Sequence, residues 1–143
     1  MERAVIDASV AVKWVLEESG SPQACRLRGA RLEAPELLLV ECANILWKKV
    51  RLGDLREEEA MERLDLLARA PVIIWAVSPD LLMRALRLAL DLRHPVYDCL
   101  YLALALQQGA PLVTADHRFA QAVSRHRALA RRIRPLNDLP ALT

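Results

Sequence analysis

Short β-rich segments alternate with longer amphipathic segments along this chain of 143 residues. Such alternation is typical of α/β domains, in which helices connect the strands of a mostly parallel sheet. The segments expected to form strands are 3–7, 72–77, 112–114, 133–136 and a short one near 33–34. Because the chain has the length of one ordinary domain and contains no repeat or long linker, we expect residues 1–143 to form a single domain.

Capping signals divide the remaining segments into helices. Ser21-Pro22 and Ser78-Pro79 are each typical of an N-cap followed by proline at the first helical position. Residues 54–57 fit a capping box. Gly53 and Gly109 stand where the end of a helix favours a left-handed residue.

The composition excludes some classes of protein. Hydrophobic residues make up 54% of the chain, but the apolar runs are too short for a membrane span. The N-terminus lacks the pattern of an export signal, so we expect a cytoplasmic protein without membrane contact. Three cysteines in apolar surroundings, Cys25, Cys42 and Cys99, are expected to be reduced and buried.

Most of the 18 acidic residues suit solvated helix faces, but two of them follow expected strands. Asp7 closes the first strand and Asp116 closes the segment 111–116. Open parallel sheets bind ligands at the carboxyl ends of their strands, which favours a functional site there. Either residue alone is better explained as the N-cap of the helix that follows, because such caps are frequent.

Two further acids lie in strongly apolar helices. Glu41 shares a stripe with polar residues opposite the expected apolar face, and this stripe meets either water or a cleft. The stripe consists of Glu41, Asn44, Lys48 and Arg51, and the apolar face of Leu39, Ala43, Leu46 and Val50. Asp98 is the single charge in the run 96–106, and burying it unpaired would cost several kcal/mol. It therefore needs a cation, a water-filled pocket or the free N–H groups of a helix start.

A parallel sheet could bring these four acids together at one edge. Four carboxylates about 5 Å apart would repel one another by about 3 kcal/mol per pair at an effective dielectric constant near 20, unless a cation lay between them. Oxygen ligands without a convergent histidine or cysteine favour Mg²⁺ or Mn²⁺ over zinc. Such ions commonly serve phosphate chemistry, so the pattern indicates phosphodiester hydrolysis.

Basic residues gather near the C-terminus although the net charge is only +2. The segment 117–137 contains no acid and six arginines: Arg118, Arg125, Arg127, Arg131, Arg132 and Arg134. This segment is either a solvated surface or a contact for phosphates or an acidic partner, and the sequence leaves both open.

Three segments resemble the PIN-domain family, and within it the VapC-type ribonuclease toxins of toxin–antitoxin pairs. They read VIDASVAVKWVLEE at 5–18, ECANILWKKVRLG at 41–53 and YDCLYLALALQQGAPLVTADHRFA at 97–120. The resemblance implies a three-layer α/β/α sandwich around a parallel sheet of about five strands. It also implies a metal-dependent endoribonuclease, which is inhibited by a cognate VapB-type antitoxin and commonly forms a homodimer. Cys99 stands where the family more often has alanine, and this difference changes little in the assignment to the family.

The same resemblance assigns roles to individual residues. It implies that Asp7, Asp98 and Asp116 hold one or two Mg²⁺ or Mn²⁺ ions, and that Glu41 completes the cluster or orients the attacking water. The supporting polar groups would be Ser9, Asn44 and Thr114.

Other assignments fit less well or remain as alternatives. A receiver domain would need a late lysine, whereas the lysines are Lys13, Lys48 and Lys49. An aspartyl phosphatase would need Asp-x-Asp where this chain has Asp7-Ala8-Ser9. A PIN nuclease of RNA processing and an inactive PIN-like binding module remain open.

Overall fold

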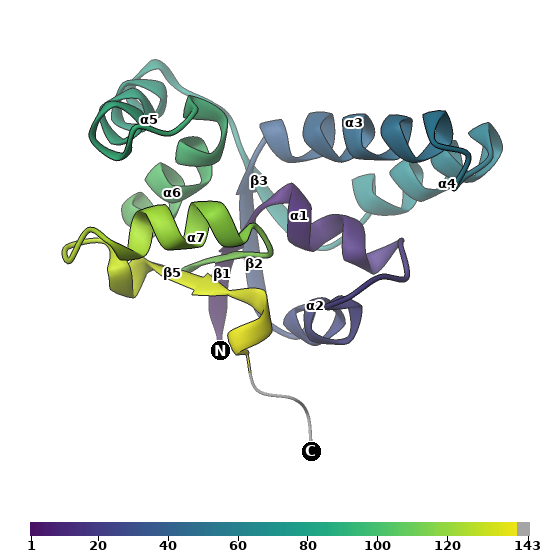
Figure 1. The fold of residues 1–143 in the computed structure, drawn as a ribbon, viewed down its shortest axis with the longest axis horizontal. Coiled ribbons are helices and arrows are strands. Elements are labelled where there is room, and N and C mark those ends of the chain that lie inside the picture. Colours follow the sequence, from purple (N-terminus) through teal and green to yellow (C-terminus); the bar gives the residue numbers. More distant parts are fainter. Residues whose placement is uncertain (140–143) are drawn as a thin grey trace.

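The computed structural model describes residues 1–139, which contain a five-stranded sheet with helices on both sides (Figure 1). All four strand pairs are parallel, in the order β3-β2-β1-β4-β5. The strands are β1 (Arg3–Ile6), β2 (Arg31–Pro35), β3 (Val72–Trp75), β4 (Leu112–Thr114) and β5 (Ile133–Pro135). This arrangement confirms the predicted α/β/α fold class with a parallel sheet, and the short strand near 33–34 proves to be five residues long.

Helices connect the strands, because parallel strands cannot be joined by tight hairpins. They are α1 (Ala8–Ala11), α2 (Ser21–Leu27), α3 (Leu37–Arg51), α4 (Glu57–Ala68), α5 (Pro79–Leu92), α6 (Val96–Gln108) and α7 (His117–Ser124). Three 3₁₀ turns accompany them: η1 (Val12–Trp14), η2 (Ala130–Arg132) and η3 (Leu136–Asp138).

Helix α6 packs against the sheet and contacts β1, β2, β4 and α5. Every residue from Cys99 to Ala105 is buried, which explains why this helix is apolar on nearly all sides. Asp98 therefore stands at the start of the helix that has the longest run of buried residues among residues 1–139.

Some capping predictions are confirmed and others are wrong. The Ser78 hydroxyl caps α5 by accepting from the Leu81 N–H at 3.1 Å, and Gly53 and Gly109 have φ angles of +81° and +64°. Helix α2, however, begins at Ser21 itself and its N-cap residue is Gly20, while the Ser21 hydroxyl donates to the carbonyl of Leu16.

The capping box of α4 lies two residues beyond the predicted one. The backbone N–H of Arg56 donates to the Glu59 carboxylate at 3.1 Å, whereas Asp54 belongs to the turn after α3, where its N–H donates to the Lys49 carbonyl. The buried face of α3 is also rotated from the expected one and consists of Leu38, Cys42 and Leu46.

All three cysteines are free, but only Cys42 and Cys99 are buried. The expectation of burial is wrong for Cys25, which lies on the exposed side of the short helix α2. Across residues 1–139, no helix has both the length and the hydropathy needed to cross a membrane.

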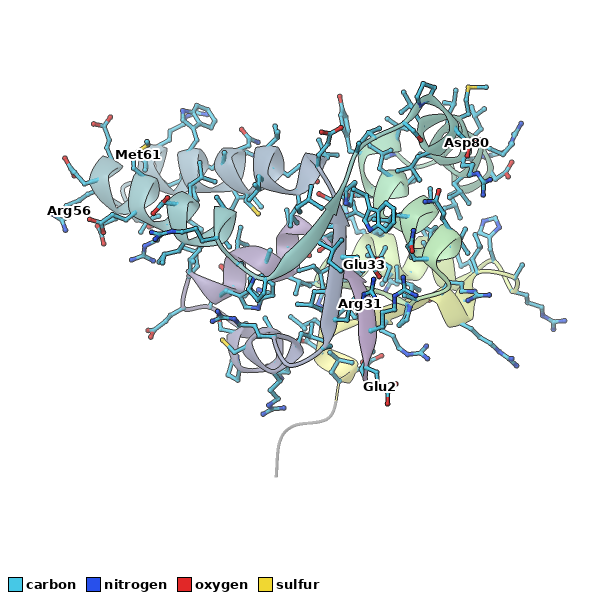
Figure 2. The ribbon with its side chains drawn as sticks, turned by 180° about the vertical axis from the view of Figure 1, so that it is seen from behind. Glu2, Arg31, Glu33, Arg56, Met61 and Asp80 are labelled. Carbon is cyan, nitrogen blue, oxygen red and sulfur yellow. The ribbon has the colours of Figure 1, made fainter. Side chains whose placement is uncertain are left out.

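One carboxylate, Glu33 on β2, is completely buried in the sheet; Figure 2 shows it on the same strand as Arg31. Its two oxygens accept from the Arg3 guanidinium at 2.6 and 3.2 Å, and the Trp75 indole N–H donates to it at 3.1 Å. Arg3 also donates to the backbone and side chain of Gln108 on α6. Burial raises the pKa of Glu33, but the hydrogen bonds and charge of Arg3, with the Trp75 bond, outweigh it and hold the pKa below its ordinary value.

We expect Glu33→Gln to lower the free energy of unfolding by about 3 kcal/mol at neutral pH, because it breaks a buried ion pair that joins three strands to α6. This expected loss lies at the low end of the range for broken buried ion pairs, because the Arg3 side chain is 36% exposed and can turn to water. Urea unfolding measures the difference, with Glu58→Gln as a surface control.

The difference in unfolding free energy between the wild type and Glu33→Gln should also depend on pH. Because its folded-state pKa is lowered, Glu33 contributes stability above its ordinary pKa of 4.5 and loses that contribution as the pH falls through the lower value. The wild type should therefore lose its advantage over Glu33→Gln in acid. An advantage of the same size at low and neutral pH would contradict this account.

Candidate active site

The two strand-end acids lie side by side because β1 and β4 are neighbours, with Ile6 paired to Val113. Asp7 follows β1 and caps α1 by accepting from the Val10 N–H at 3.3 Å. Asp116 follows β4 and caps α7 by accepting from the Phe119 N–H at 3.1 Å. The N-cap alternative is thus correct for both residues, and the caps hold both carboxyl groups at the same edge of the sheet.

A pocket of about 560 Å³ opens at this edge and is lined by all four predicted acids. Asp7 and Asp116 come from the strand ends, Glu41 from α3 and Asp98 from the first turn of α6. Segments far apart in the sequence therefore meet here, as the positions of α1, α3, α6 and α7 around the sheet show (Figure 1).

Two hydroxyl groups hold the buried carboxylate of Asp7. Ser9 donates to its Oδ1 and Thr114 donates to its Oδ2. The same hydroxyls accept from the next turn: Ser9 from the Ala115 N–H at 2.9 Å and Thr114 from the Asp116 N–H at 3.0 Å. Ser9 and Thr114, predicted as supporting groups, thus link the β1–α1 and β4–α7 turns.

The electrostatics of Asp7 are unusual for an aspartate. Burial raises its pKa to about 7, the negative charge of Asp98 adds to the increase, and the bonds from Ser9 and Thr114 oppose it. Asp7 is only 5% exposed. A cation in the pocket would favour the ionised form, which burial disfavours.

Glu41 has a partner that the sequence pattern did not reveal. The fully buried phenol of Tyr101 donates to Glu41 Oε1, so α6 holds an acid of α3. Burial raises the pKa of Glu41 and the charge of Asp98 adds to this, while the Tyr101 bond opposes it. The available signal was spacing, since Tyr101 lies three residues after Asp98 and so on the same side of α6.

The carboxylate of Asp98 lies against a histidine. His94 Nε2 is 2.6 Å from Asp98 Oδ2, and the two side chains are 18% and 29% exposed. The expectation that no histidine converges on the acids is therefore wrong. The Asp98 carboxylate is thus held by His94. No backbone N–H within residues 1–139 donates to it.

The remaining candidates differ in their relation to the pocket. Asn44 and Lys48 are exposed and line it, but the Asn44 side chain makes no hydrogen bond to the four acids within residues 1–139. Arg118 and the arginines of 125–134 are exposed and do not line it, so Lys48 is the basic residue on its wall.

The donor set suits a hard divalent cation, because all four acidic groups are carboxylates in one pocket. Within residues 1–139, however, no three acidic, histidine or cysteine side chains already form a metal-binding cluster. The hydroxyl, phenol and imidazole contacts described above occupy one or more oxygens of Asp7, Glu41 and Asp98. Metal binding would thus use the free oxygens of Glu41 and Asp98 and, at Asp7, where both oxygens already accept hydrogen bonds, a further lone pair or a small movement of the side chain.

Comparison with known proteins identifies the family. The model of the PIN domain matches residues 4–124. The chain belongs to the PIN-domain family. Among the relatives of this PIN domain, Ribonuclease VapC3 from Pyrobaculum aerophilum is 37% identical over 120 residues, which cover 82% of this chain and 92% of that protein.

Two solved structures resemble this PIN domain in fold. One is Mycobacterium tuberculosis VapC20, a sarcin-ricin loop cleaving toxin, with a TM-score of 0.63 and 17% identity over 83% of this chain and 94% of that one. The other is VapBC2 from Rickettsia felis bound to a DNA fragment from its promoter, with a TM-score of 0.65 and 14% identity over 93% of this chain and 98% of that one.

The raised pKa of Asp7 predicts a pH-dependent loss of stability in metal-free protein. Because the folded-state pKa of about 7 lies above the ordinary 3.8, the contribution of Asp7 is fully present below pH 3.8 and is lost as the pH rises through about 7. We expect Asp7→Asn to avoid this loss and to exceed the wild type in unfolding free energy at pH 8.5 by up to about 4 kcal/mol.

Urea unfolding in EDTA at about pH 5.5 and about pH 8.5 measures this difference. Asp54→Asn, a change at an exposed aspartate, is the control, and its unfolding free energy should equal that of the wild type at both pH values. Equal pH dependence in Asp7→Asn and the wild type would show that Asp7 titrates normally.

The Tyr101 contact predicts energetic coupling between α6 and α3. Tyr101→Phe removes only the hydroxyl group that donates to Glu41, so we expect a loss of about 1.5–3 kcal/mol in unfolding free energy at pH 8. In a double-mutant cycle with Glu41→Gln, the two changes should be non-additive by about 1 kcal/mol. Tyr97→Phe, at an exposed tyrosine, should change stability by less than about 0.5 kcal/mol, and additive effects would exclude the coupling.

Proposed function

We propose that this protein is a metal-dependent endoribonuclease that hydrolyses RNA phosphodiester bonds, and that it is the toxin of a VapBC-type toxin–antitoxin pair. The observation that carries the proposal is the convergence of Asp7, Glu41, Asp98 and Asp116 on one pocket at the carboxyl edge of the sheet. The VapC ribonuclease that is 37% identical over most of the chain supports the same activity. Residues 1–143 would form one nuclease domain, in keeping with the shared core of the described residues.

Asp7, Asp98 and Asp116 would hold the divalent cation, Mg²⁺ or Mn²⁺, directly or through water. When bound, the cation supplies Lewis-acid stabilisation of the negative charge on the phosphate. The protein contributes the positions of its carboxylates: Ser9 and Thr114 fix Asp7, and the N-cap bond to Phe119 fixes Asp116. Asn44 on the pocket wall is a further polar group for substrate or water.

Glu41 would orient the attacking water. Tyr101 holds its Oε1, which leaves Oε2 to accept a hydrogen bond from the water. In the reaction, the water oxygen forms a bond to phosphorus as one P–O ester bond breaks, the attacking water gives up one proton to the solvent, and the leaving oxygen takes up one proton from it. Lys48, which lines the pocket, would contact a neighbouring RNA phosphate.

The proposal includes protein partners. A cognate VapB-type antitoxin would cover the toxin, and a second copy of the chain would form a homodimer. Both contacts need apolar surface, and the exposed side chains of α3, α4 and α5 provide it. They include Trp47, Met61, Leu66, Met83 and Leu90. A toxin of this kind acts on cellular RNA, so we place it in the cytoplasm.

The nuclease activity is tested by incubating structured RNAs, such as ribosomal RNA and tRNA, with purified protein and Mg²⁺ or Mn²⁺. The protein must first be freed of any small partner that copurifies. We expect cleavage that EDTA abolishes and that Asp116→Asn reduces at least about 100-fold, because the cluster then loses one charge. Asparagine is as good an N-cap as aspartate, so this variant keeps α7 intact.

Asp54→Asn is the matched control and should cleave RNA like the wild type, since Asp54 is an exposed turn residue away from the pocket. Cleavage that survives EDTA or the Asp116→Asn change would contradict the proposal. Failure of the folded wild type to bind Mn²⁺ would also contradict it.

A further inference from the structure

We propose that His94 is a positioning residue, which holds the Asp98 carboxylate in the orientation that metal binding requires. This inference rests on the proposed function, because it assigns a purpose to a side chain beside one of the four acids. The chemical group concerned is the His94 Nε2, which lies 2.6 Å from Asp98 Oδ2. With Oδ2 held in this way, Oδ1 is the oxygen of Asp98 that remains for a cation.

The backbone is shaped to bring the imidazole to this position. Helix α5 ends at Leu92, and Arg93 then adopts φ +53° and ψ +48°, the single positive φ of a non-glycine among residues 1–139. The N–H of His94 donates to the Ala89 carbonyl at 3.1 Å, which closes α5. A left-handed arginine costs conformational energy, so the surrounding structure must hold this turn in place.

Pro95 restricts the same segment from the other side. A residue before proline is confined to extended conformations, which limits the backbone of His94. Pro95 is also the N-cap residue of α6, so His94 lies outside the helix while Asp98 lies in its first turn. The backbone position of His94 is therefore fixed by a strained turn before it and a proline after it.

The ring of His94 also packs on the helix that carries the fourth acid. Its centroid lies 4.7 Å from that of Phe119, at an interplanar angle of 38°. Phe119 is buried, and its backbone N–H donates to Asp116 Oδ1. One imidazole thus contacts the acid of α6 and packs against the residue that holds the acid of α7.

Groups that hold a metal-binding carboxylate or imidazole commonly affect metal affinity 10- to 100-fold when they are removed. A ring that served packing alone would affect stability and leave the metal affinity unchanged. The two roles are separable, because phenylalanine keeps the ring and glutamine keeps an N–H donor.

The test compares His94→Phe and His94→Gln with the wild type. Mn²⁺ affinity is measured from the electron paramagnetic resonance signal of the free ion, and the melting temperature is measured in EDTA. We expect His94→Phe to fold and to bind Mn²⁺ about 10- to 100-fold more weakly, and His94→Gln to bind within about threefold of the wild type. In RNA cleavage, kcat at fixed Mn²⁺ should fall in His94→Phe and recover in His94→Gln.

Asp98→Asn in the same assay separates this inference from the proposed function. If Asp98→Asn weakens Mn²⁺ binding and folded His94→Phe does not, the positioning role is wrong and the metal site stands. If folded His94→Gln binds as weakly as Asp98→Asn, hydrogen-bond donation by His94 is likewise excluded, even where His94→Phe fails to fold. If the wild type binds no Mn²⁺, or Asp98→Asn binds as well as the wild type, the assignment of Asp98 as a ligand fails and the positioning role fails with it.

Discussion

The candidate site depends on one interaction, the pair of hydroxyl bonds that holds the buried carboxylate of Asp7. Ser9 and Thr114 both donate to Asp7, and both accept N–H groups from the turn that leads to Asp116. This arrangement is available only because β1 and β4 are parallel neighbours that end at the same level. A carboxylate so deeply buried would otherwise remain protonated, so the site combines a high desolvation cost with groups that reduce it.

Helix α6 joins the interior of the protein to the pocket. It packs across three strands, carries Asp98 in its first turn and reaches Glu41 through Tyr101 one turn later. The position of two acids is thereby tied to the packing of the core and not to the loops. At the opposite end of the sheet, the Arg3–Glu33 pair ties α6 to the strands through Gln108.

The sequence predicted the fold class, the five strands and the convergence of the four acids, because each depends on local periodicity or on the rule for parallel strand ends. Ser9 and Thr114 were also found, since they lie within two residues of the acids they contact. The partners Tyr101 and His94 were missed: an aromatic residue in an apolar helix and a histidine before proline each have an ordinary structural explanation. The rotation of α3 and the exposure of Cys25 depend on how whole helices pack, which periodicity alone does not determine.

The capping role of Asp116 has an evolutionary consequence. Because asparagine caps a helix as well as aspartate does, one substitution at this position can remove a charge from the pocket while the fold and the outer surface stay unchanged. Under the proposed function, a chain with this substitution would keep the surface that an antitoxin contacts, and it would compete with intact copies for that antitoxin. In the proposed nuclease, the change from an enzyme to a decoy would therefore take a single substitution.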